Sequence, residues 1–305
     1  MYTAQSYHAN GKLLLTGEYL LLLGAKGIAL PLKKGQNLMV TAENDLEMLE
    51  WNAYYGNRIW FSCKLNPRHF SVLETSDPGK AETLSFIFHT IRDMNPDSRP
   101  MSGLNFTTVL DANPDWGLGS SSTLISLMAQ FSGVDPYLLN SLVFNGSGFD
   151  IACAKADGPI FYSKNNPVQP VTLDYPFSDQ LFLVYSGVKK KTHSEVNTFL
   201  KSKRVTKQII GEGSALADAF SICRDQKEFG NLIQCHEELI GHLIGKTPVK
   251  MEYFFDFDGE IKSLGAWGGD FYLASSRLPI SKVMTYFGNK GLIVLFQWND
   301  LILNR

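Results

Sequence analysis

The fold is decided by the stretch Asp115-Trp116-Gly117-Leu118-Gly119-Ser120-Ser121-Ser122-Thr123, which is followed by an apolar run. Gly117 and Gly119 can adopt backbone angles closed to other residues, so the chain can approach a ligand closely there. Ser120 to Thr123 offer hydroxyl groups and backbone N–H groups where a helix would begin. The pattern predicts a phosphate-binding loop at a helix N-terminus. A serine-capped helix after a glycine turn, with no ligand, fits the same residues.

The neighbouring segments give this loop a suitable context. Residues 104–110 read as a strand that runs directly into the loop, and an apolar helical run follows it. Upstream, residues 46–62 alternate polar and apolar around Tyr54-Tyr55-Gly56-Asn57, which predicts a hairpin. Residues 81–94 have the apolar spacing of an amphipathic helix. The loop is therefore expected between a strand and a helix.

The rest of the chain mixes both kinds of element. Strands are expected at 13–15, 20–23, 28–31, 36–41, 158–162, 171–173, 181–185 and 291–296. Helices are expected at 135–143, from Asp150 onward, over most of 196–245 with an interruption at 211–214, and at 283–287. A third glycine-rich loop, Gly265 to Asp270, should lead into a strand. We expect two domains, residues 1–165 and 166–305.

Composition narrows the class of protein. The 305 residues are 44% hydrophobic and 19% charged, with a formal net charge of −2, which fits a soluble globular protein without nucleic-acid or membrane partners. The four cysteines are scattered, without metal-binding spacing, as in a reducing compartment. No secretory signal pattern or run long enough to span a membrane is found. These features predict a cytoplasmic protein.

Two charged residues are set into an apolar stretch near the N-terminus. Lys12 precedes Leu13 to Leu15, and Glu18 precedes a run of leucines. A buried charge needs a partner, so one interpretation is an ion pair that faces a site. The other is a lysine and a glutamate on the surface at strand ends.

A second glycine-serine segment, Gly146-Ser147-Gly148, places Asp150 in the first turn of a helix. An acid in that position can be a favourable charge at the helix N-terminus, worth about 0.3–1 kcal/mol. Because another glycine-serine loop lies nearby in sequence, a catalytic role is the alternative that we favour.

Basic residues cluster at Lys189-Lys190-Lys191-Thr192-His193. Lysines followed by Thr and His at a helix start would hold an anionic substrate. A solvated basic turn is the competing interpretation. His236 and His242, further along, are interpreted as structural or surface residues.

Taken in order, these loops resemble the motifs of the GHMP kinases, the superfamily of galacto-, homoserine, mevalonate and phosphomevalonate kinases. Gly11-Lys12 with Gly17-Glu18-Tyr19 resembles the first motif, Gly117 to Ser122 the second, and Gly265 to Asp270 the third. The segment from Gly146 to Ala152 resembles the one that carries the catalytic aspartate, and phosphomevalonate kinase is the nearest likeness. The resemblance implies an α+β, two-layer GHMP-kinase-like fold with an N-terminal nucleotide-binding domain and a C-terminal substrate domain.

The resemblance also implies roles for residues. Asp150 would accept the substrate proton, and Lys12 would neutralise charge on the transferred group. ATP phosphates would bind the loop, and Ser121 would ligate Mg²⁺. The loop residues are Gly117, Leu118, Gly119, Ser120, Ser121 and Ser122. The residues expected around a small anionic substrate are Glu18, Ser147, Lys191, Thr192, His193, Gly268, Gly269 and Asp270.

Two departures from the family pattern affect the substrate more than the fold. Trp267 stands where the third motif usually has glycine, and Leu138-Leu139-Asn140 has no carboxylate where mevalonate kinases carry a magnesium-binding glutamate. The expected activity is ATP-dependent phosphorylation of mevalonate or 5-phosphomevalonate. The alternatives are a kinase for another small alcohol or sugar, a decarboxylase, and a silent nucleotide or metabolite sensor on the same fold. A homodimer is the default assembly.

Overall fold

A computed structural model describes residues 4–42, 47–96, 103–164, 166–188, 205–265 and 267–304. The chain divides into two compact units. The first comprises residues 1–11, 34–114 and 118–155, and the second comprises residues 12–33, 115–117 and 156–305. Within the described ranges, no helix combines the length and the apolar character needed to cross a membrane.

The first unit is built on a sheet whose strands run in the order β5-β4-β3-β6-β2, with β1 pairing β2. The pairs β5–β4, β4–β3 and β6–β2 are antiparallel, and β3 and β6 are parallel. The strands are β1 (Gln5–Leu14), β2 (Gly27–Ala42), β3 (Leu49–Tyr55), β4 (Arg58–Leu65), β5 (Val72–Thr75) and β6 (Leu104–Leu110).

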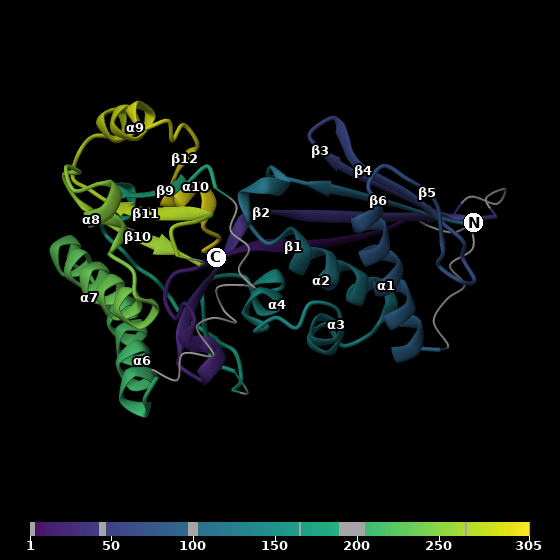
Figure 1. The fold of residues 1–305 in the computed structure, drawn as a ribbon, viewed down its shortest axis with the longest axis horizontal. Helices are drawn as coiled ribbons and strands as arrows, with labels where there is room; N and C mark the ends of the chain where they lie inside the picture. Colours follow the sequence, from purple (N-terminus) through teal and green to yellow (C-terminus); the bar gives the residue numbers. More distant parts are fainter. Residues whose placement is uncertain are drawn as a thin grey trace. The chain divides into compact units, whose positions relative to one another are not determined.

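Helices cover one face of this sheet (Figure 1). They are α1 (Pro78–Met94), α2 (Ser120–Ser132), α3 (Pro136–Val143) and α4 (Phe149–Ala154). The core between sheet and helices contains Trp51, which stacks on Phe106 with 5.5 Å between ring centroids, and Phe88, which meets Phe106 edge-on. The apolar face of α1, expected from its spacing, is the one that supplies Phe88.

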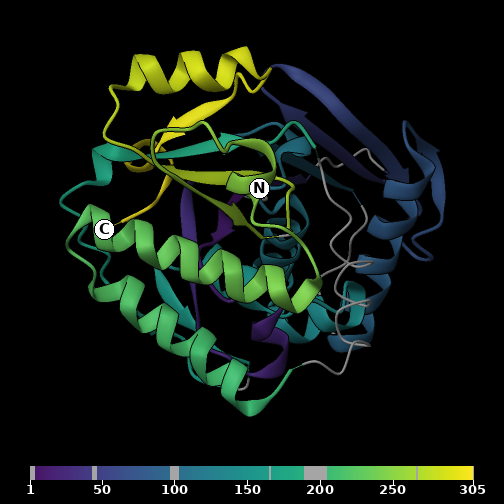
Figure 2. The ribbon, with the colours of Figure 1, turned by 60° about the vertical axis from the view of Figure 1, so that its left-hand side comes forward.

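The second unit has its own antiparallel sheet, ordered β10-β11-β9-β12. Its strands are β9 (Leu181–Tyr185), β10 (Glu260–Leu264), β11 (Phe271–Ser275) and β12 (Leu295–Gln297). Helices α6 (Lys207–Ile222) and α7 (Gln226–Ile244) run side by side, and α7 packs on β10 (Figure 2). The remaining helices are α8 (Val249–Tyr253), α9 (Ile280–Asn289) and α10 (Trp298–Leu301).

Short elements complete the second unit. The first three residues of β2 pair with β7 (Ile160–Tyr162), which pairs in turn with β8 (Gln169–Pro170). Single 3-10 turns are η1 (Leu20–Leu23) and η3 (Ser178–Gln180); a third, η2 (Pro114–Trp116), opens the loop before α2.

Most of the expected elements are confirmed. The strand at 104–110 is β6, the hairpin at 46–62 is β3 and β4, and the helix at 81–94 lies within α1. The helix at 135–143 is α3 with Asp135 as its N-cap, and the third glycine-rich loop leads into β11.

Four expectations are wrong. Leu20–Leu23 forms the 3-10 turn η1 rather than a strand, because Gly17, Tyr19 and Gly24 all have positive φ angles that coil the chain. Residues 171–173 form no strand, and the pairing lies at Gln169–Pro170 instead. Residues 211–214 do not interrupt α6. The closing strand is shorter and later than 291–296, since β12 spans Leu295–Gln297.

Candidate active site

The serine end of the glycine-serine loop opens helix α2 in the first unit. Gly119 is the N-cap, with a φ of 98° in the left-handed region that favours glycine. The first backbone N–H groups of a helix have no acceptor within the helix, and they carry its positive dipole end. The chain therefore turns at Gly119 and presents these donors at Ser120 to Ser122. This arrangement suits an anion such as a phosphate.

The hydroxyl side chains of the loop differ in burial and in hydrogen bonding. Ser122 is buried, and its hydroxyl donates to the Gly119 carbonyl oxygen at 2.8 Å. Thr123, also buried, has its Oγ1 2.7 Å from Gln36 Oε1 on β2. Ser121 is exposed, and Ser120 is half-buried. Ser122 and Thr123 fix the loop from inside, and Ser121 is accessible to a ligand.

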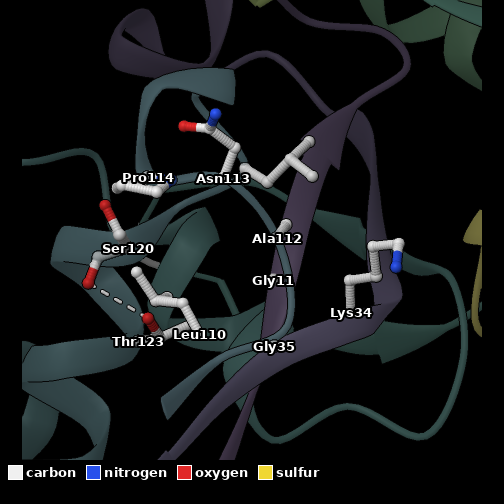
Figure 3. A pocket seen from close by; sticks show the side chains of 10 residues that line it. Gly11, Lys34, Gly35, Leu110, Ala112, Asn113, Pro114, Ser120 and Thr123 are labelled. Atoms are coloured by element: carbon white, nitrogen blue, oxygen red, sulfur yellow. Dashed lines mark hydrogen bonds between the residues drawn. The ribbon is translucent and has the colours of Figure 1, made fainter. Parts of the chain in front are cut away.

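A small pocket lies beside the loop within the first unit (Figure 3). It is bounded by Lys34 and Gly35 on β2, by Asn113 and Pro114 after β6, and by Ser120. The pocket is partly open to solvent, and its water-accessible volume is about 20 Å³, enough for a water molecule but not for a nucleotide base. The pocket is therefore no base-binding site in this conformation.

The glycine end of the loop belongs to the second unit. The Tyr185 hydroxyl on β9 donates to the Asp115 carbonyl oxygen at 3.1 Å. The Trp116 ring meets the Phe296 ring of β12 edge-on, with 5.5 Å between centroids. Residues 115–117 are thus held by the sheet of that unit.

Gly117 lies between a cation and a carboxylate. The Lys12 ammonium is 3.4 Å from the Gly117 carbonyl oxygen, to which it donates. The Asp270 side chain packs so closely on Gly117 that a β-carbon built there would be 2.4 Å from Asp270 Cγ. Lys12 of the first motif and Asp270 of the third therefore both contact Gly117 of the second, while the catalytic role expected of Lys12 stays a prediction.

We expect Gly117→Ala to lower the free energy of unfolding by about 2–4 kcal/mol, because it adds a steric clash to the strain of a left-handed backbone. Gly133→Ala is the matched control: Gly133 has a φ of 71° against 72° at Gly117, but no atom lies within 4 Å of the place that its β-carbon would take. The control should cost only about 1–2 kcal/mol. Urea denaturation of both variants measures the difference. Adding Asp270→Ala to Gly117→Ala should remove most of the difference between the two variants. Equal losses of unfolding free energy at Gly117 and Gly133 would contradict the clash with Asp270.

Asp150 lies in the first turn of α4, as expected. Gly148 is the N-cap, with a φ of 92°, and the Asp150 carboxylate accepts from the Ile151 N–H at 3.2 Å. Asp150 and Ser147 are half-buried, and α4 packs against α2 within the first unit. Asn140, in the α3 stretch that lacks a carboxylate, is buried, with its side-chain amide packed against Gly146.

The third glycine-rich loop is tied to the first motif. Trp267 is buried in the core of the second unit, and its backbone N–H donates to the Tyr19 hydroxyl at 3.2 Å. Gly268 donates its N–H to the Ser263 hydroxyl at 2.6 Å. The tryptophan side chain thus serves as a core anchor of the loop, while Gly268 has the positive φ, 67°, that a turn requires.

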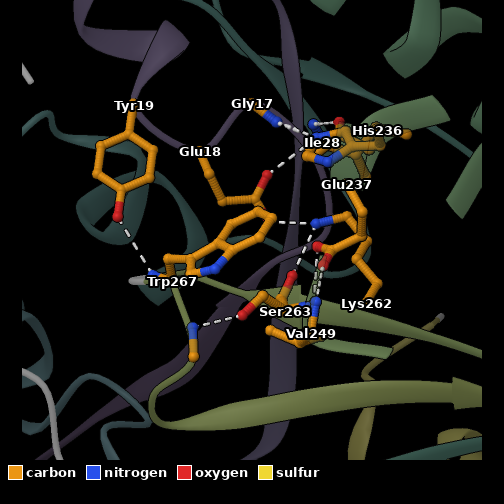
Figure 4. Close-up of polar contacts among 12 residues, drawn as sticks. Gly17, Glu18, Tyr19, Ile28, His236, Glu237, Val249, Lys262, Ser263 and Trp267 are labelled. Carbon is orange, nitrogen blue, oxygen red and sulfur yellow. Dashed lines mark hydrogen bonds and ion pairs between the residues drawn. The ribbon is translucent and has the colours of Figure 1, made fainter. Parts of the chain in front are cut away.

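Glu18 has partners that the sequence analysis did not connect with it (Figure 4). Its carboxylate pairs with the Lys262 ammonium, and its other oxygen is 3.0 Å from His236 Nε2. The exposed fractions of Glu18, Lys262 and His236 are 3%, 0% and 2%. At that burial the Glu18 carboxylate holds protein groups, and its expected contact with a substrate stays a prediction. His236 is structural, as expected, and His242 is exposed.

Burial and charge set the protonation of this group. Burial alone would raise the pKa of Glu18, but Lys262 and His236 together hold that pKa below its ordinary value. Burial, and then the Lys262 charge, lower the pKa of His236, so its ring is neutral. The Gly17 N–H donates to His236 Nε2 at 3.4 Å, so the ring also contacts the turn of the first motif.

A second carboxylate, Glu237, supports the same region from α7. Its exposed fraction is 1%, and its two oxygens accept the N–H groups of Ser263 at 3.0 Å and Val249 at 3.2 Å. Burial raises the pKa of Glu237 to about 7, although Lys262 and both N–H donors lower it in part.

This raised pKa predicts a pH-dependent stability. Between its ordinary value of 4.5 and about 7, Glu237 keeps a proton in the folded protein that the unfolded chain releases. Stability therefore falls as pH rises through that range. In denaturant titrations from about pH 5 to about pH 8, wild type should lose up to about 3 kcal/mol relative to Glu237→Gln, which cannot titrate. A difference between the two proteins that stays constant with pH would contradict this assignment.

The structure does not test the expected roles of the basic cluster and of the Mg²⁺ ligand. Lys191, Thr192 and His193 lie outside the described residues, so their substrate role stays a prediction. Across the described ranges, no group of three or more His, Cys, Asp or Glu side chains is arranged to hold a metal ion. The assignment of Ser121 as a Mg²⁺ ligand stays a prediction.

No protein-family model matches the sequence, and no curated protein matches it. Solved structures match the fold over almost the whole chain. The Methanococcus jannaschii mevalonate kinase has a TM-score of 0.74 at 19% identity, covering 99% of each chain. The Streptococcus pneumoniae phosphomevalonate kinase, in complex with phosphomevalonate and AMPPNP, has a TM-score of 0.68 at 15% identity, covering 97% of this chain and 100% of that one. The Lactococcus lactis galactokinase, complexed with galactose, has a TM-score of 0.67 at 10% identity, covering 99% of this chain and 93% of that one.

These structural neighbours are GHMP kinases, and the chain has their fold. The expected fold class, a mixed α+β architecture of this type, is confirmed. At identities between 10% and 19% the likeness defines the fold and leaves the substrate to be argued from residues.

Proposed function

We propose that this chain is an ATP-dependent kinase that transfers the γ-phosphoryl group to a mevalonate-type acid, either 5-phosphomevalonate or mevalonate. The observation that carries the proposal is the loop at the start of α2. A left-handed Gly119 turns the chain so that the helix N-terminus and the exposed Ser121 are presented together. The loop contains no Walker-type lysine, so the backbone N–H groups and helix dipole would hold the phosphates.

Phosphoryl transfer requires alignment and neutralised charge more than covalent chemistry. Asp150 would accept a proton from an acceptor hydroxyl, or orient an acceptor phosphate, which needs little proton abstraction. Lys12 would neutralise charge on the transferred group. The residues that we propose around the substrate are Ser147, Gly268, Gly269 and Asp270. The chemistry that Mg²⁺ would supply is neutralisation of the β- and γ-phosphate charge.

Two other functions have support from particular observations. The galactokinase neighbour supports a kinase for a sugar or other small alcohol. The buried Trp267 in the third loop, and the absence of a carboxylate at 138–140, support a silent nucleotide or metabolite sensor. The presence of both Lys12 and Asp150 favours catalysis, because a sensor needs neither.

We expect AMPPNP to bind the purified protein in the presence of Mg²⁺, in titrations followed by calorimetry. Ser121→Ala should raise the Mg²⁺ concentration needed for half-maximal binding about 10-fold or more, because it removes the one hydroxyl ligand we assign. Ser141→Ala, which changes an exposed serine on α3, is the matched control. Absence of nucleotide binding by wild type would contradict the proposal, and equal Mg²⁺ dependence in all three proteins would remove Ser121 as a ligand.

A further inference from the structure

The first and third motifs share one buried anchor within the second unit. Glu18 follows β1, Lys262 is on β10, and His236 and Glu237 are neighbours on α7 (Figure 4). Lys262 pairs with Glu18 and also donates to the Ser263 carbonyl oxygen at 2.8 Å. One ammonium group therefore connects the turn of the first motif with Ser263, which lies two residues before the third loop.

The backbone N–H, the carbonyl oxygen and the hydroxyl of Ser263 each make a hydrogen bond. Its N–H donates to Glu237, its carbonyl oxygen accepts from Lys262, and its hydroxyl accepts from the Gly268 N–H. The Trp267 N–H donates to the hydroxyl of Tyr19, the residue after Glu18. The two motifs are thus joined twice, once through the ion pair and once directly.

Burying an ion pair at position 262 costs desolvation free energy that an apolar side chain would not cost. Residues 261–264 are all buried, so both faces of β10 are covered and an apolar side chain would suit position 262. Apolar replacements of buried pairs are often neutral or stabilising, so stability alone does not account for Lys262. Unlike an apolar residue, Lys262 makes directional contacts with two acceptors, the Glu18 carboxylate and the Ser263 carbonyl oxygen.

We propose that the Glu18–Lys262 pair is a positioning device that holds residues 267–270 of the third loop in the conformation that binds the acceptor. This inference rests on the proposed function for the role of the loop. The positioning itself is independent of that function, because it predicts a local structural effect. Lys262 and Glu18 act here as positioning residues, and the substrate contact expected for Glu18 is not needed for that role.

The double variant Glu18→Gln/Lys262→Met tests the proposal, because it removes both charges with little change of volume and leaves no unpaired buried ion. Lys250→Met/Glu260→Gln is the matched control: it removes another ion pair that involves β10, with 2.8 Å between Nζ and Oε1. Amide hydrogen exchange is measured on both folded variants. We expect at least 10-fold faster exchange at Trp267 and Gly268 in the test variant, with β11 unchanged, and no such change in the control.

Unchanged exchange at Trp267 and Gly268 in the test variant would overturn the proposal, since the loop would then keep its conformation without the pair. Kinetics give a second readout. The test variant should bind AMPPNP as wild type does, while its kcat/KM for the acceptor falls at least 10-fold. If wild type phosphorylates no acceptor, the proposed function fails, but the exchange result still decides whether the pair positions the loop.

Discussion

Asp150→Asn is expected to reduce kcat by about 10²–10⁴-fold if the acceptor is a hydroxyl, because general-base catalysis contributes that much and asparagine cannot accept the proton. The side chain has nearly the same size, and Asp150 is half-buried in the first turn of α4, so the fold should persist. Steady-state phosphorylation of the acceptor, measured as ADP release, gives the change. For a phosphate acceptor we expect a much smaller reduction, since Asp150 would then only orient the substrate.

The control separates catalysis from helix electrostatics. Glu228 lies in the first turn of α7, and Glu228→Gln removes a comparable first-turn charge without touching the proposed site. Each variant should lose about 0.3–1 kcal/mol of stability from the helix dipole. If both retain full activity with every acceptor that wild type uses, Asp150 is only a helix-terminal charge.

Lys262→Met should lower the free energy of unfolding by about 3–5 kcal/mol, because it leaves the Glu18 carboxylate buried without its cation. Urea denaturation at neutral pH measures the loss. Adding Glu18→Gln should recover most of it, since no unpaired ion then remains in the core.

Lys250→Met offers the comparison on the same part of the fold. Its pair with Glu260 is only partly buried, so its loss should cost about 0–1 kcal/mol. Equal costs at Lys262 and Lys250 would contradict the strong coupling that we assign to the buried pair.

The sequence predicted the loop before α2 well because its signals are local. A strand, two glycines, three serines and an apolar run lie in succession, and each residue type restricts the backbone at its own position. Asp150 was placed correctly in a helix first turn for the same reason. Periodicity also located α1 and the β3–β4 hairpin.

Elements whose local sequence fits two conformations, or that depend on distant contacts, could not be predicted in this way. Four leucines in a row are as consistent with a buried helical turn as with a strand, and η1 is set by the positive φ angles around it. Glycine at 213 suggested a break in α6, but a β-carbon there would lie 2.6 Å from Leu20 Cδ1, so this glycine allows close packing inside a continuous helix.

The partner of Glu18 shows the same limit within the candidate site. Lys262 is 244 positions away along the chain, and no local pattern marks it. A lysine in a short apolar strand reads as a surface residue until the strand is known to be covered on both faces. The sequence therefore identified Glu18 as an unusual charge but not the cation that pairs with it.

The central claim is that the chain phosphorylates a mevalonate-type acid. The most direct measurement is ADP release by the purified protein with Mg²⁺-ATP, with mevalonate, 5-phosphomevalonate and galactose offered in separate reactions. We predict turnover with one of the two acids, strongly reduced by Asp150→Asn when that acid is mevalonate, and none with galactose. Binding of AMPPNP without turnover of either acid would contradict the claim and favour a sensor, and turnover of galactose alone would favour a sugar kinase.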